Sequence, residues 1–430
     1  MRSSLLTCTL ASLAAVNAIP TISVKGSKFF TSDGDQFFLK GIAYQLVPDD
    51  PLIDNNQCQL DAKLMKDLGA NSIRVYHVDP SGDHKACMST FADVGIYLWV
   101  DLDTFNTQIE QSAPHWNQSQ LEAFQAVMDE FQQYENTAGF FVGNEVLTTS
   151  NGSVAAPFVK AAARDLKAYR NSKKYRNIPI GYSAADIADL RPMLQNYMAC
   201  GTNTSESLDF FSLNAYEWCG QSSYAQSGYS QLMKNASSYS IPIFLSETGC
   251  IEPKPRNFDD QQAIFGEMST VWSGAIIYEW IEEANGYGII QYGEKVDPAA
   301  EGAPPDGYSR SGTPTPISPD FPNLSKHWKT LNPTGVKASE YSPTLTPPPC
   351  PAFTSNVWVV NGGVALPTLG QTFDAGVQSS ITAGTAAQSA PTGNTSPSPT
   401  KGAAPGSPIR EVQGMGLGLI GVLVGFFWWM

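Results

Sequence analysis

The sequence predicts an α/β fold: a (β/α)8 TIM barrel with a small C-terminal β-rich appendage and a disordered tail. The first observation is that short apolar runs, typical of buried parallel strands, alternate with segments of helical periodicity. The second is that the chain contains eight such strand candidates, the number that closes this kind of barrel. The third is that Glu145 and Glu247 each stand where an apolar run ends, the place where barrels carry functional side chains.

The elements begin with a predicted hairpin. Residues 29–38 place an Asp-Gly pair between two apolar segments, and this pair is a strong signal for a tight turn between antiparallel strands. Runs of mainly apolar residues follow, each of a length that suits a strand buried on both faces. The predicted barrel strands are 38–44, 72–76, 96–101, 139–143, 178–182, 210–215, 242–246 and 275–280.

Helical patterns separate the predicted strands. Between Leu121 and Phe131, apolar side chains recur at helical spacing and form one stripe, which we interpret as core packing and not as a cofactor site. The predicted helices are 59–68, 84–93, 119–134, 157–171, 185–197, 229–238 and 259–270. Active sites of barrels form at the carboxyl ends of the strands, so Glu145 would end the fourth strand and Glu247 the seventh.

The alternation ends beyond about residue 323, where the composition changes. We therefore expect a catalytic barrel over 19–322, an appendage packed on it over 323–378 and a stalk over 379–402. Residues 353–373 are the part of the appendage that we expect to form β-structure. The stalk consists mainly of Ser, Thr, Pro, Ala and Gly, so it cannot bury a core, and we expect O-linked glycans on it.

Residues 1–18 have the pattern of a secretory signal peptide, in which Arg2 precedes an apolar stretch and the small Ala18 ends the segment. Export agrees with the cysteines that follow, because an even set in a secreted chain implies disulfides, although the residues leave their pairing open. These cysteines are Cys58, Cys87, Cys200, Cys219, Cys250 and Cys350. Asn-x-Ser/Thr sequons predict N-glycosylation at Asn117, Asn151, Asn203, Asn235, Asn323 and Asn394.

Residues 403–430 have the pattern of a glycosylphosphatidylinositol (GPI) anchor signal, which is removed when the anchor is attached. Small residues, a polar spacer and an uncharged apolar tail follow one another. We expect attachment at Gly402, with Gly406 or Asn394 as alternatives. The competing interpretation is a tail anchor that stays in place, although the tail is shorter than the roughly 20 residues that a membrane span needs.

The charge and the scarcity of metal-ligand patterns exclude several classes of function. A formal net charge of -14 without basic runs does not suit nucleic-acid binding and favours a neutral substrate. No Cys-x-x-Cys pair occurs, and the four histidines are scattered, so we interpret them as surface or rim residues. We therefore predict no metal site and no cofactor, and we expect a monomer.

Two acids at the ends of barrel strands suggest the paired carboxylates that cleave glycosidic bonds. An unpaired buried carboxylate costs several kcal/mol, so packing explains neither Glu145 nor Glu247. The alternative is that each forms a salt bridge with a loop. A retaining glycosidase needs one protonated and one ionised carboxyl group about 5–5.5 Å apart. Asn144, beside Glu145, would hydrogen-bond the 2-hydroxyl of the sugar; the alternative for it is a loop cap.

Six motifs resemble, in order along the chain, those of the fungal β-1,3-glucanosyltransferases of glycoside hydrolase family 72, which are GPI-anchored elongases of cell-wall glucan. They are KGIAYQ at 40–45, RVY at 74–76, GNE at 143–145, NAYEWCG at 214–220, SETGC at 246–250 and NGYG at 285–288. The resemblance covers roughly residues 22–350. The Asn-Glu pair alone would indicate only the wider clan of barrel glycosidases.

The resemblance implies that Glu145 is the acid/base and Glu247 the nucleophile. It implies the disulfides Cys58–Cys87, Cys200–Cys350 and Cys219–Cys250, and glucan contacts at Gln45, Tyr76, Asp101, Asn144, Asp186, Arg191, Tyr216, Tyr278 and Tyr287. An aromatic face covers the apolar face of a pyranose, which supports the tyrosines, although a single tyrosine in a barrel strand is more often core. Asp186 and Arg191 could instead form an ion pair at the rim.

By resemblance, the expected activity is internal cleavage of a β-1,3-glucan and transfer of the new reducing end to the non-reducing end of another chain, with retained configuration. The expected partners are donor and acceptor glucans and, through a GPI anchor, the membrane at the cell surface or the cell wall. One alternative is a hydrolytic endo-β-1,3-glucanase on the same barrel. The other is a catalytically inactive wall protein that binds glucan.

Overall fold

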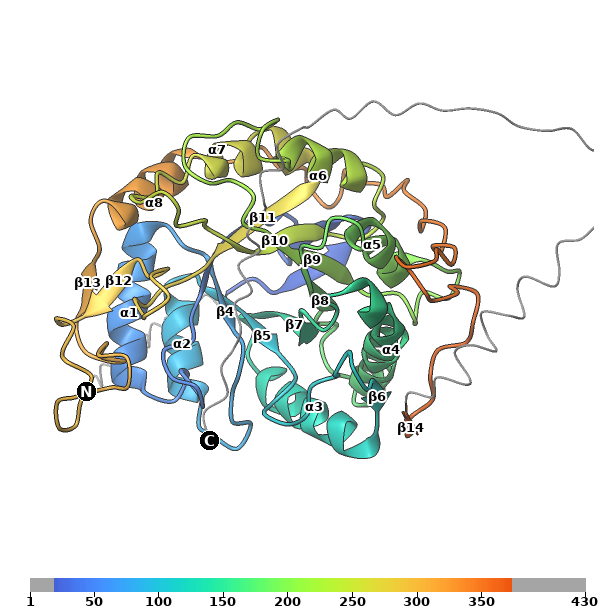
Figure 1. Ribbon diagram of the computed structural model, residues 1–430, viewed down its shortest axis with the longest axis horizontal. Helices are drawn as coiled ribbons and strands as arrows, with labels where there is room; N and C mark the ends of the chain where they lie inside the picture. Colours follow the sequence, from blue (N-terminus) through green and yellow to red (C-terminus); the bar gives the residue numbers. More distant parts are fainter. Residues whose placement is uncertain (1–18, 373–430) are drawn as a thin grey trace, which may run out of the picture. The chain divides into compact units, whose positions relative to one another are not determined.

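A closed barrel of eight parallel strands forms the centre of the computed structural model, which describes residues 19–372 (Figure 1). All eight predicted strands are present, and the last closes on the first, with Gly274 opposite Leu39. The predicted barrel is therefore confirmed. Its strands are β3 (Leu39–Ala43), β4 (Ser72–Val75), β5 (Tyr97–Asp101), β7 (Thr137–Asn144), β8 (Ile180–Ala185), β9 (Phe210–Asn214), β10 (Ile243–Thr248) and β11 (Trp272–Ile277).

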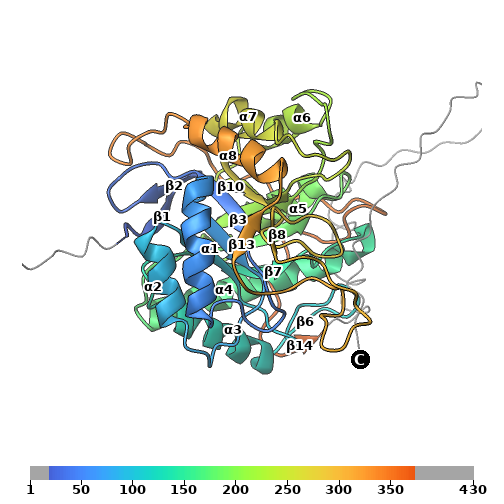
Figure 2. The same cartoon turned by 90° about the vertical axis from the view of Figure 1, so that its left-hand side faces the viewer.

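Helices cover the outside of the barrel. They are α1 (Asn55–Leu68), α2 (Lys85–Asp93), α3 (Gln118–Phe131), α4 (Ala156–Ser172), α5 (Arg191–Ala199), α6 (Tyr229–Ala236), α7 (Asp260–Phe265) and α8 (Asp320–Thr330), with 3-10 turns η1 (Ser150–Ala155) and η2 (Glu267–Thr270). Figure 2 shows α1 and α8 side by side on one flank of the barrel, so elements from both ends of the described chain complete the outer layer.

Helix α8 was missing from the predicted elements, and the expected domain boundary after residue 322 falls inside it. Phe321, Leu324 and Trp328 are all buried, and their spacing places them on one helical face. Trp328 also donates its indole N–H to Gln261 on α7, at 2.8 Å. The helix therefore belongs to the outer layer of the barrel, and its short buried stripe has the same helical spacing as those of the other helices.

The start of α5 was also placed too early. The prediction began the helix at residue 185, but β8 runs to Ala185 and α5 begins at Arg191. Proline is well tolerated in a first helical turn, and Pro192 occupies that position here. The residues between strand and helix form a loop on the rim of the barrel, which matters for the site described below.

The amino-terminal hairpin lies one strand earlier than predicted. β1 (Ile22–Lys25) pairs antiparallel with β2 (Lys28–Thr31), and the turn between them contains Gly26 at a φ of 56°. The predicted Asp-Gly turn exists, but it supports only an isolated bridge between Phe30 and Gln36. The predicted hairpin has its turn at Asp33-Gly34, whereas the observed hairpin turns further upstream at Gly26, whose left-handed backbone allows a tight turn.

The hairpin closes the amino-terminal end of the barrel. Phe29 of β2 is fully buried, and its ring lies 5.2 Å from that of Trp99 and 6.0 Å from those of Phe210 and Phe244. Phe210 and Phe244 stand at the starts of β9 and β10, and Trp99 stands in the middle of β5, so the cluster fills the barrel below the carboxyl ends of the strands. Edge-to-face packing of this kind leaves the barrel floor filled with side chains.

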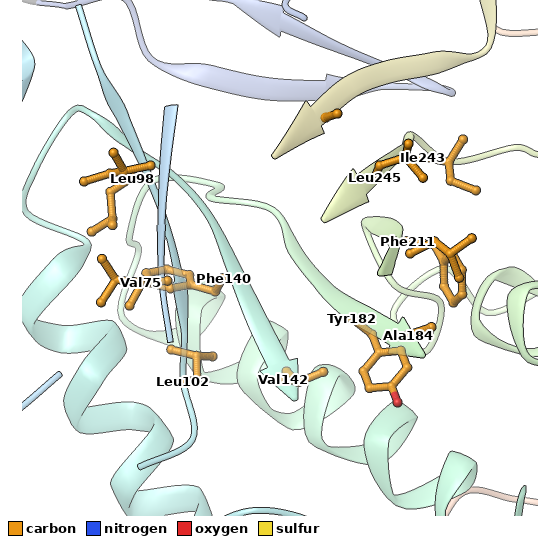
Figure 3. Close-up of a cluster of buried hydrophobic side chains, with 14 of the residues drawn as sticks. Val75, Leu98, Leu102, Phe140, Val142, Tyr182, Ala184, Phe211, Ile243 and Leu245 are labelled. Atoms are coloured by element: carbon orange, nitrogen blue, oxygen red, sulfur yellow. The ribbon is translucent and has the colours of Figure 1, made fainter. Parts of the chain in front are cut away.

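Neighbouring residues on each strand serve two separate cores. Phe141 points into the barrel with the Phe29 cluster, whereas Phe140 and Val142 belong to the larger cluster between the strands and the helices. Figure 3 shows part of this outer cluster, including Tyr182 and Phe211. Because successive strand side chains point to opposite faces, a strand with both faces buried must be apolar throughout. This is why the eight strands were readable as apolar runs.

The segment after α8 runs along the barrel wall. Trp358 is fully buried, with its ring 5.3 Å from that of Tyr197, and the disulfide Cys200–Cys350 fastens the segment. Its end, β14 (Gln371–Thr372), pairs with β6 (His115–Trp116); β12 (Ile290–Tyr292) and β13 (Pro314–Pro316) form another small sheet. The other two disulfides, Cys58–Cys87 and Cys219–Cys250, pair as the resemblance implies.

Several predictions concern residues outside the described part of the chain: the signal peptide (1–18), the stalk (379–402), the GPI signal (403–430), Gly402, Gly406 and Asn394. They stay predictions. Among residues 19–372, no helix has both the length and the apolar character needed to cross a membrane.

One histidine is not the surface or rim residue that the sequence suggested. His84 is fully buried; its Nε2 lies 2.7 Å from a carboxylate oxygen of Asp50 and its Nδ1 lies 2.9 Å from one of Glu130. Since both partners are acceptors, both ring nitrogens donate, which requires the imidazolium form. Burial alone would lower the pKa of His84, but the hydrogen bonds to Asp50 and Glu130 outweigh it and raise the pKa.

This arrangement makes the free energy of unfolding depend on pH. Because the pKa of His84 is raised in the folded state, its stabilisation is fully present below the pKa of the unfolded chain. It is lost as the pH rises through the folded-state pKa. We expect His84→Gln to remove roughly 2 kcal/mol, mainly on the acidic side. Urea unfolding followed by circular dichroism, from mildly acidic to mildly alkaline pH, measures this difference.

His115→Gln is the matched control, because the Nδ1 of His115 lies 3.0 Å from the backbone oxygen of Ala113 and pairs with no carboxylate in the described chain. Equal pH slopes for the wild type and His84→Gln would show that the imidazolium contributes nothing.

Candidate active site

The two glutamates lie at the same end of the barrel, on the fourth and seventh strands as predicted. Glu145 directly follows β7, and its backbone N–H continues the ladder to Ser183 of β8, at 2.8 Å. Glu247 lies near the end of β10, opposite Asn214 of β9. Glu145 has a φ of 50°, in the left-handed region that a non-glycine residue rarely occupies, and such backbone strain concentrates at functional sites.

Arg74 occupies the centre of this end of the barrel and is fully buried. Its guanidinium makes two hydrogen bonds to Asp101, with Nη2–Oδ2 at 3.0 Å and Nε–Oδ1 at 3.2 Å. The same group donates to Asn144 Oδ1 at 3.1 Å and reaches Glu247 Oε1 at 3.5 Å. A planar, permanently charged fork suits such a position, since several carboxylate and amide oxygens converge on it.

Glu247 is held by three groups that stabilise its ionised form. The hydroxyl of Tyr76 donates to Oε1 at 3.0 Å, that of Tyr216 donates to Oε2 at 2.9 Å, and Arg74 provides positive charge. The residue is only 9% exposed, and burial raises the pKa of Glu247 to about 7, with Glu145 raising it and Arg74 and the tyrosines opposing. Each oxygen thus has a fixed direction, and the pKa lies near neutrality.

Glu145 is half-buried and receives one directed hydrogen bond. Asn214 Nδ2 donates to Glu145 Oε1 at 2.8 Å and to Asn144 Oδ1 at 3.0 Å. The Asn214 amide is bonded on both sides, because its Oδ1 also accepts from the hydroxyls of Ser183 and Ser246, at 2.9 and 2.8 Å. Since Asn214 also stands opposite Glu247 in the register of β9 and β10, both glutamates adjoin the same residue.

Four of the predicted contact residues form an aromatic wall beside Glu247. Their rings meet edge to face: Tyr76 and Tyr278 at 6.5 Å, Tyr278 and Tyr287 at 5.4 Å, and Tyr287 and Tyr216 at 5.6 Å. All four are partly exposed, so they do not belong to the closed core. Such a wall offers apolar ring faces and hydroxyl groups together, which suits a pyranose sugar.

The other predicted contact residues lie near the site but are engaged with protein groups. The Gln45 amide bonds backbone atoms of the loops that follow β3 and β4, including the N–H groups of Tyr76 and His77. Asp101 is 2% exposed and faces Arg74, so it can orient that cation. Asp186 and Arg191 form the rim ion pair considered as their alternative, which Glu217 joins at 3.3 Å. Their contact with substrate stays a prediction.

Arg74, Asn214 and Glu279 also lie at this end of the barrel, and none of them is among the predicted site residues. The first two stand in motifs that the resemblance rests on, so their motif membership was the available signal. Glu279 directly follows Tyr278 and is 3% exposed; it accepts a hydrogen bond from Asn285 Nδ2 at 2.7 Å. Burial, followed by the nearby Glu283, raises the pKa of Glu279 to about 8. Glu279 stands near the end of the predicted strand 275–280, so its place in an apolar run was the available signal.

The five sequons in the described chain have different settings. Asn151 and Asn203 are exposed, whereas Asn117 caps α3 by accepting from the backbone N–H of Gln120 at 3.0 Å. Asn235 lies within α6; Asn323 lies within α8 and donates to the Arg256 carbonyl at 2.9 Å. Their glycosylation stays a prediction. No cluster of three or more His, Cys, Asp or Glu side chains in residues 19–372 is arranged to hold a metal ion.

Comparisons with known proteins agree with this geometry. The family model for glycoside hydrolase family 72, described as glucanosyltransferase, matches residues 11–301. The 1,3-beta-glucanosyltransferase gas2 of Schizosaccharomyces pombe is 39% identical over 371 residues, covering 82% of this chain and 76% of that protein. The 1,3-beta-glucanosyltransferase GAS5 of Saccharomyces cerevisiae is 38% identical over 385 residues, covering 86% and 75%.

A solved structure is also similar: Saccharomyces cerevisiae Gas2p, as a glutamate-to-glutamine mutant in complex with laminaritetraose and laminaripentaose. It has a TM-score of 0.71 and 37% sequence identity, and the match covers 81% of this chain and 74% of that one. The likeness therefore extends beyond the barrel topology to the sequence.

The tyrosine contacts to Glu247 can be tested by removing one hydroxyl. Tyr216→Phe removes a hydrogen bond that the ionised carboxylate accepts, so we expect the pKa of Glu247 to rise further above about 7. Losing one such hydrogen bond should raise the pKa of Glu247 by about one. Carbon-13 NMR titration of labelled glutamate carboxyl groups, with Glu247→Gln to assign the signal, measures it. Tyr287→Phe is the control, and equal shifts in both variants would contradict the assignment.

Proposed function

The chain belongs to glycoside hydrolase family 72, the glucanosyltransferases, and we propose that it elongates β-1,3-glucan with Glu247 as nucleophile and Glu145 as acid/base. The observation that carries this proposal is the pairing of two carboxylates at one end of the barrel, linked through Arg74 and Asn214. The laminari-oligosaccharides bound to the similar Gas2p structure support β-1,3-glucan as the substrate.

In the first step, Glu247 attacks the anomeric carbon of a glucosyl residue inside the donor chain. The bond to the next sugar breaks, Glu145 gives its proton to the departing oxygen, and the leaving fragment carries the original reducing end. The electron pair that held the leaving oxygen departs with it. The product is a glucosyl ester of Glu247 and an ionised Glu145.

In the second step, the non-reducing 3-hydroxyl of another glucan attacks the same anomeric carbon. Glu145 removes the hydroxyl proton, the ester bond to Glu247 breaks, and the carboxylate leaves with its electron pair. Two displacements restore the original configuration. The net product is a longer β-1,3-glucan, and both glutamates return to their starting protonation states.

The surroundings of the two acids support this division of roles. Glu247 receives two phenol hydrogen bonds and faces Arg74, so these contacts favour the ionised form that attacks and oppose the burial that raises its pKa to about 7. Glu145 is more exposed and receives a single hydrogen bond from Asn214, which leaves its second oxygen available to exchange a proton with a sugar oxygen.

Transfer competes with hydrolysis at the second step. An acceptor hydroxyl outcompetes water only if binding orients it at the anomeric carbon, because a positioned group has a high effective concentration. The aromatic wall formed by Tyr76, Tyr216, Tyr278 and Tyr287 provides sugar-binding surface, and its Tyr216 end is the part that would orient the acceptor. The alternative activity, an endo-β-1,3-glucanase, would use the same first step.

The role assignment can be tested by isosteric substitution. Glu145→Gln and Glu247→Gln each remove one ionisable group, so we expect the rate of chain elongation to fall by at least about a thousandfold in each variant, with folding and glucan binding retained. Chromatography of the products from a reduced laminari-oligosaccharide measures turnover. Circular dichroism and calorimetric titration with the same oligosaccharide test folding and binding.

Glu122→Gln is the control, because Glu122 is an exposed glutamate on helix α3 of the outer layer and has no role in the two steps. Wild-type turnover in either the Glu145→Gln or the Glu247→Gln protein would refute the assignment. In the wild type, products longer than the substrate indicate transfer, and only shorter products would indicate the hydrolase. Binding without any product would indicate the inactive wall protein.

We also propose that the protein acts at the cell surface and is held there by a GPI anchor attached at Gly402. The amino-terminal signal pattern and three disulfides support export, and the spacer and apolar tail support the anchor. Phosphatidylinositol-specific phospholipase C should release the protein from intact membranes. Substituting the small residues 402–404 with bulky ones should abolish the anchored form, and release that is unaffected by the substitution would refute the attachment site.

A further inference from the structure

Phe105 is an exposed aromatic residue at the active-site end of the barrel. It lies on the loop that follows β5, and 50% of the residue is exposed within the described chain. The tip of this loop is a hydrogen-bonded turn: Thr104 N–H donates to Thr107 Oγ1 at 2.8 Å, and Thr107 N–H donates to the Thr104 carbonyl at 3.0 Å. Asn106, inside the turn, has a φ of 66°. The turn presents Phe105 at its outer edge.

One face of the Phe105 ring is covered by His77. The ring centroids are 3.8 Å apart and the planes are 23° from parallel, so the two rings are stacked. His77 is itself fixed, because its Nδ1 lies 2.7 Å from the Asp49 carbonyl oxygen and its Nε2 accepts from the Phe105 backbone N–H at 3.1 Å. A carbonyl only accepts and an N–H only donates, so the hydrogen is on Nδ1 and the ring is neutral.

This pair is connected to the nucleophile through Tyr76. Gln45 Oε1 accepts from the backbone N–H groups of both Tyr76 and His77, at 2.9 and 3.1 Å. The Tyr76 hydroxyl in turn donates to Glu247 Oε1 at 3.0 Å. The stacked rings therefore occupy a defined position on the side of Glu247 where Tyr76 lies.

The two sides of Glu247 differ in what they adjoin. Tyr216 bonds the other carboxylate oxygen, and the Asn214 side chain, two residues away in the chain, donates to Glu145. Glu145, the acid that serves the departing and incoming chains, is thus bonded directly from the Tyr216 side, whereas Arg74, two residues before Tyr76, donates to its neighbour Asn144. The opposite side, beyond Tyr76, is left for the donor glucan that becomes bonded to Glu247.

We propose that the Phe105–His77 pair is a stacking platform for a glucosyl residue of the donor β-1,3-glucan, several sugars away from the bond that is cleaved. The exposed face of Phe105 matches the apolar face of a pyranose, and a chain cleaved internally must extend past the reacting sugars. His77 acts as a positioning residue, since it fixes the ring without touching the substrate. The inference rests on the proposed function and adds a determinant of donor length.

The test measures how kcat/KM depends on donor length. Reduced laminari-oligosaccharides of increasing length serve as donors, with one short labelled acceptor kept constant. In the wild type, kcat/KM should increase until the platform is occupied. Phe105→Ala should remove the last increase in kcat/KM. The value for long donors should fall by about two- to tenfold, and the value for short donors should stay unchanged. Phe105→Trp should restore it.

His77→Phe tests the positioning role, because it keeps an aromatic ring but removes both hydrogen bonds of the imidazole. We expect it to lose part of the same increment, with an unchanged rate on short donors. Phe353→Ala is the matched control, since Phe353 is also exposed, at 47%, but lies on the segment that contains Cys350. It should behave as the wild type at every length.

The outcomes separate this inference from the proposed function. A wild type that forms no elongated product would refute the function itself. Elongation with identical length dependence in the wild type and Phe105→Ala would refute the platform alone. An increment that follows acceptor length instead of donor length would also overturn the proposal, because it would place the platform on the other side of the cleaved bond.

Discussion

The site depends on the contacts that the buried guanidinium of Arg74 makes with its neighbours. The guanidinium lies where the carboxyl ends of the barrel strands converge and joins side chains from β5, β7 and β10, namely Asp101, Asn144 and Glu247. Removing one partner of a buried ion pair typically costs about 3–5 kcal/mol. Each of these strand ends is therefore held in one position by electrostatics. Arg74 contacts Glu247 directly and fixes Glu145 only through its neighbour Asn144.

The fold could be predicted where burial requires an unbroken run of apolar residues. Barrel strands are buried on both faces, so Phe140, Phe141 and Val142 stand as an unbroken apolar run, and such runs were found for all eight strands. Helix α8 was missed because proline-rich and polar residues surround its short apolar stripe. The hairpin was displaced because Asp-Gly signals a turn but says nothing of which segments pair across it.

The candidate site was predictable only in part. The strand-end positions of Glu145 and Glu247 follow from the barrel rule, and the motifs suggested the tyrosines that form the wall. The hydrogen-bond network could not be predicted from the sequence, because Asn214 accepts hydrogen bonds from Ser183 and Ser246, which lie on strands that are distant in the sequence. The burial of single polar residues could not be predicted either. A lone histidine in the sequence does not show whether it lies on the rim or, like His84, is a buried imidazolium.

The aromatic floor around Phe29 has a consequence for the order of events. Because side chains fill the amino-terminal end of the barrel, every molecule must reach and leave the glutamates through one opening. In the proposed mechanism, the departing fragment and the incoming chain both need the position next to Glu145, and two polysaccharides cannot occupy it together. The departing fragment must then leave through this one opening before a new chain enters by it, which is the kinetic pattern of a ping-pong reaction.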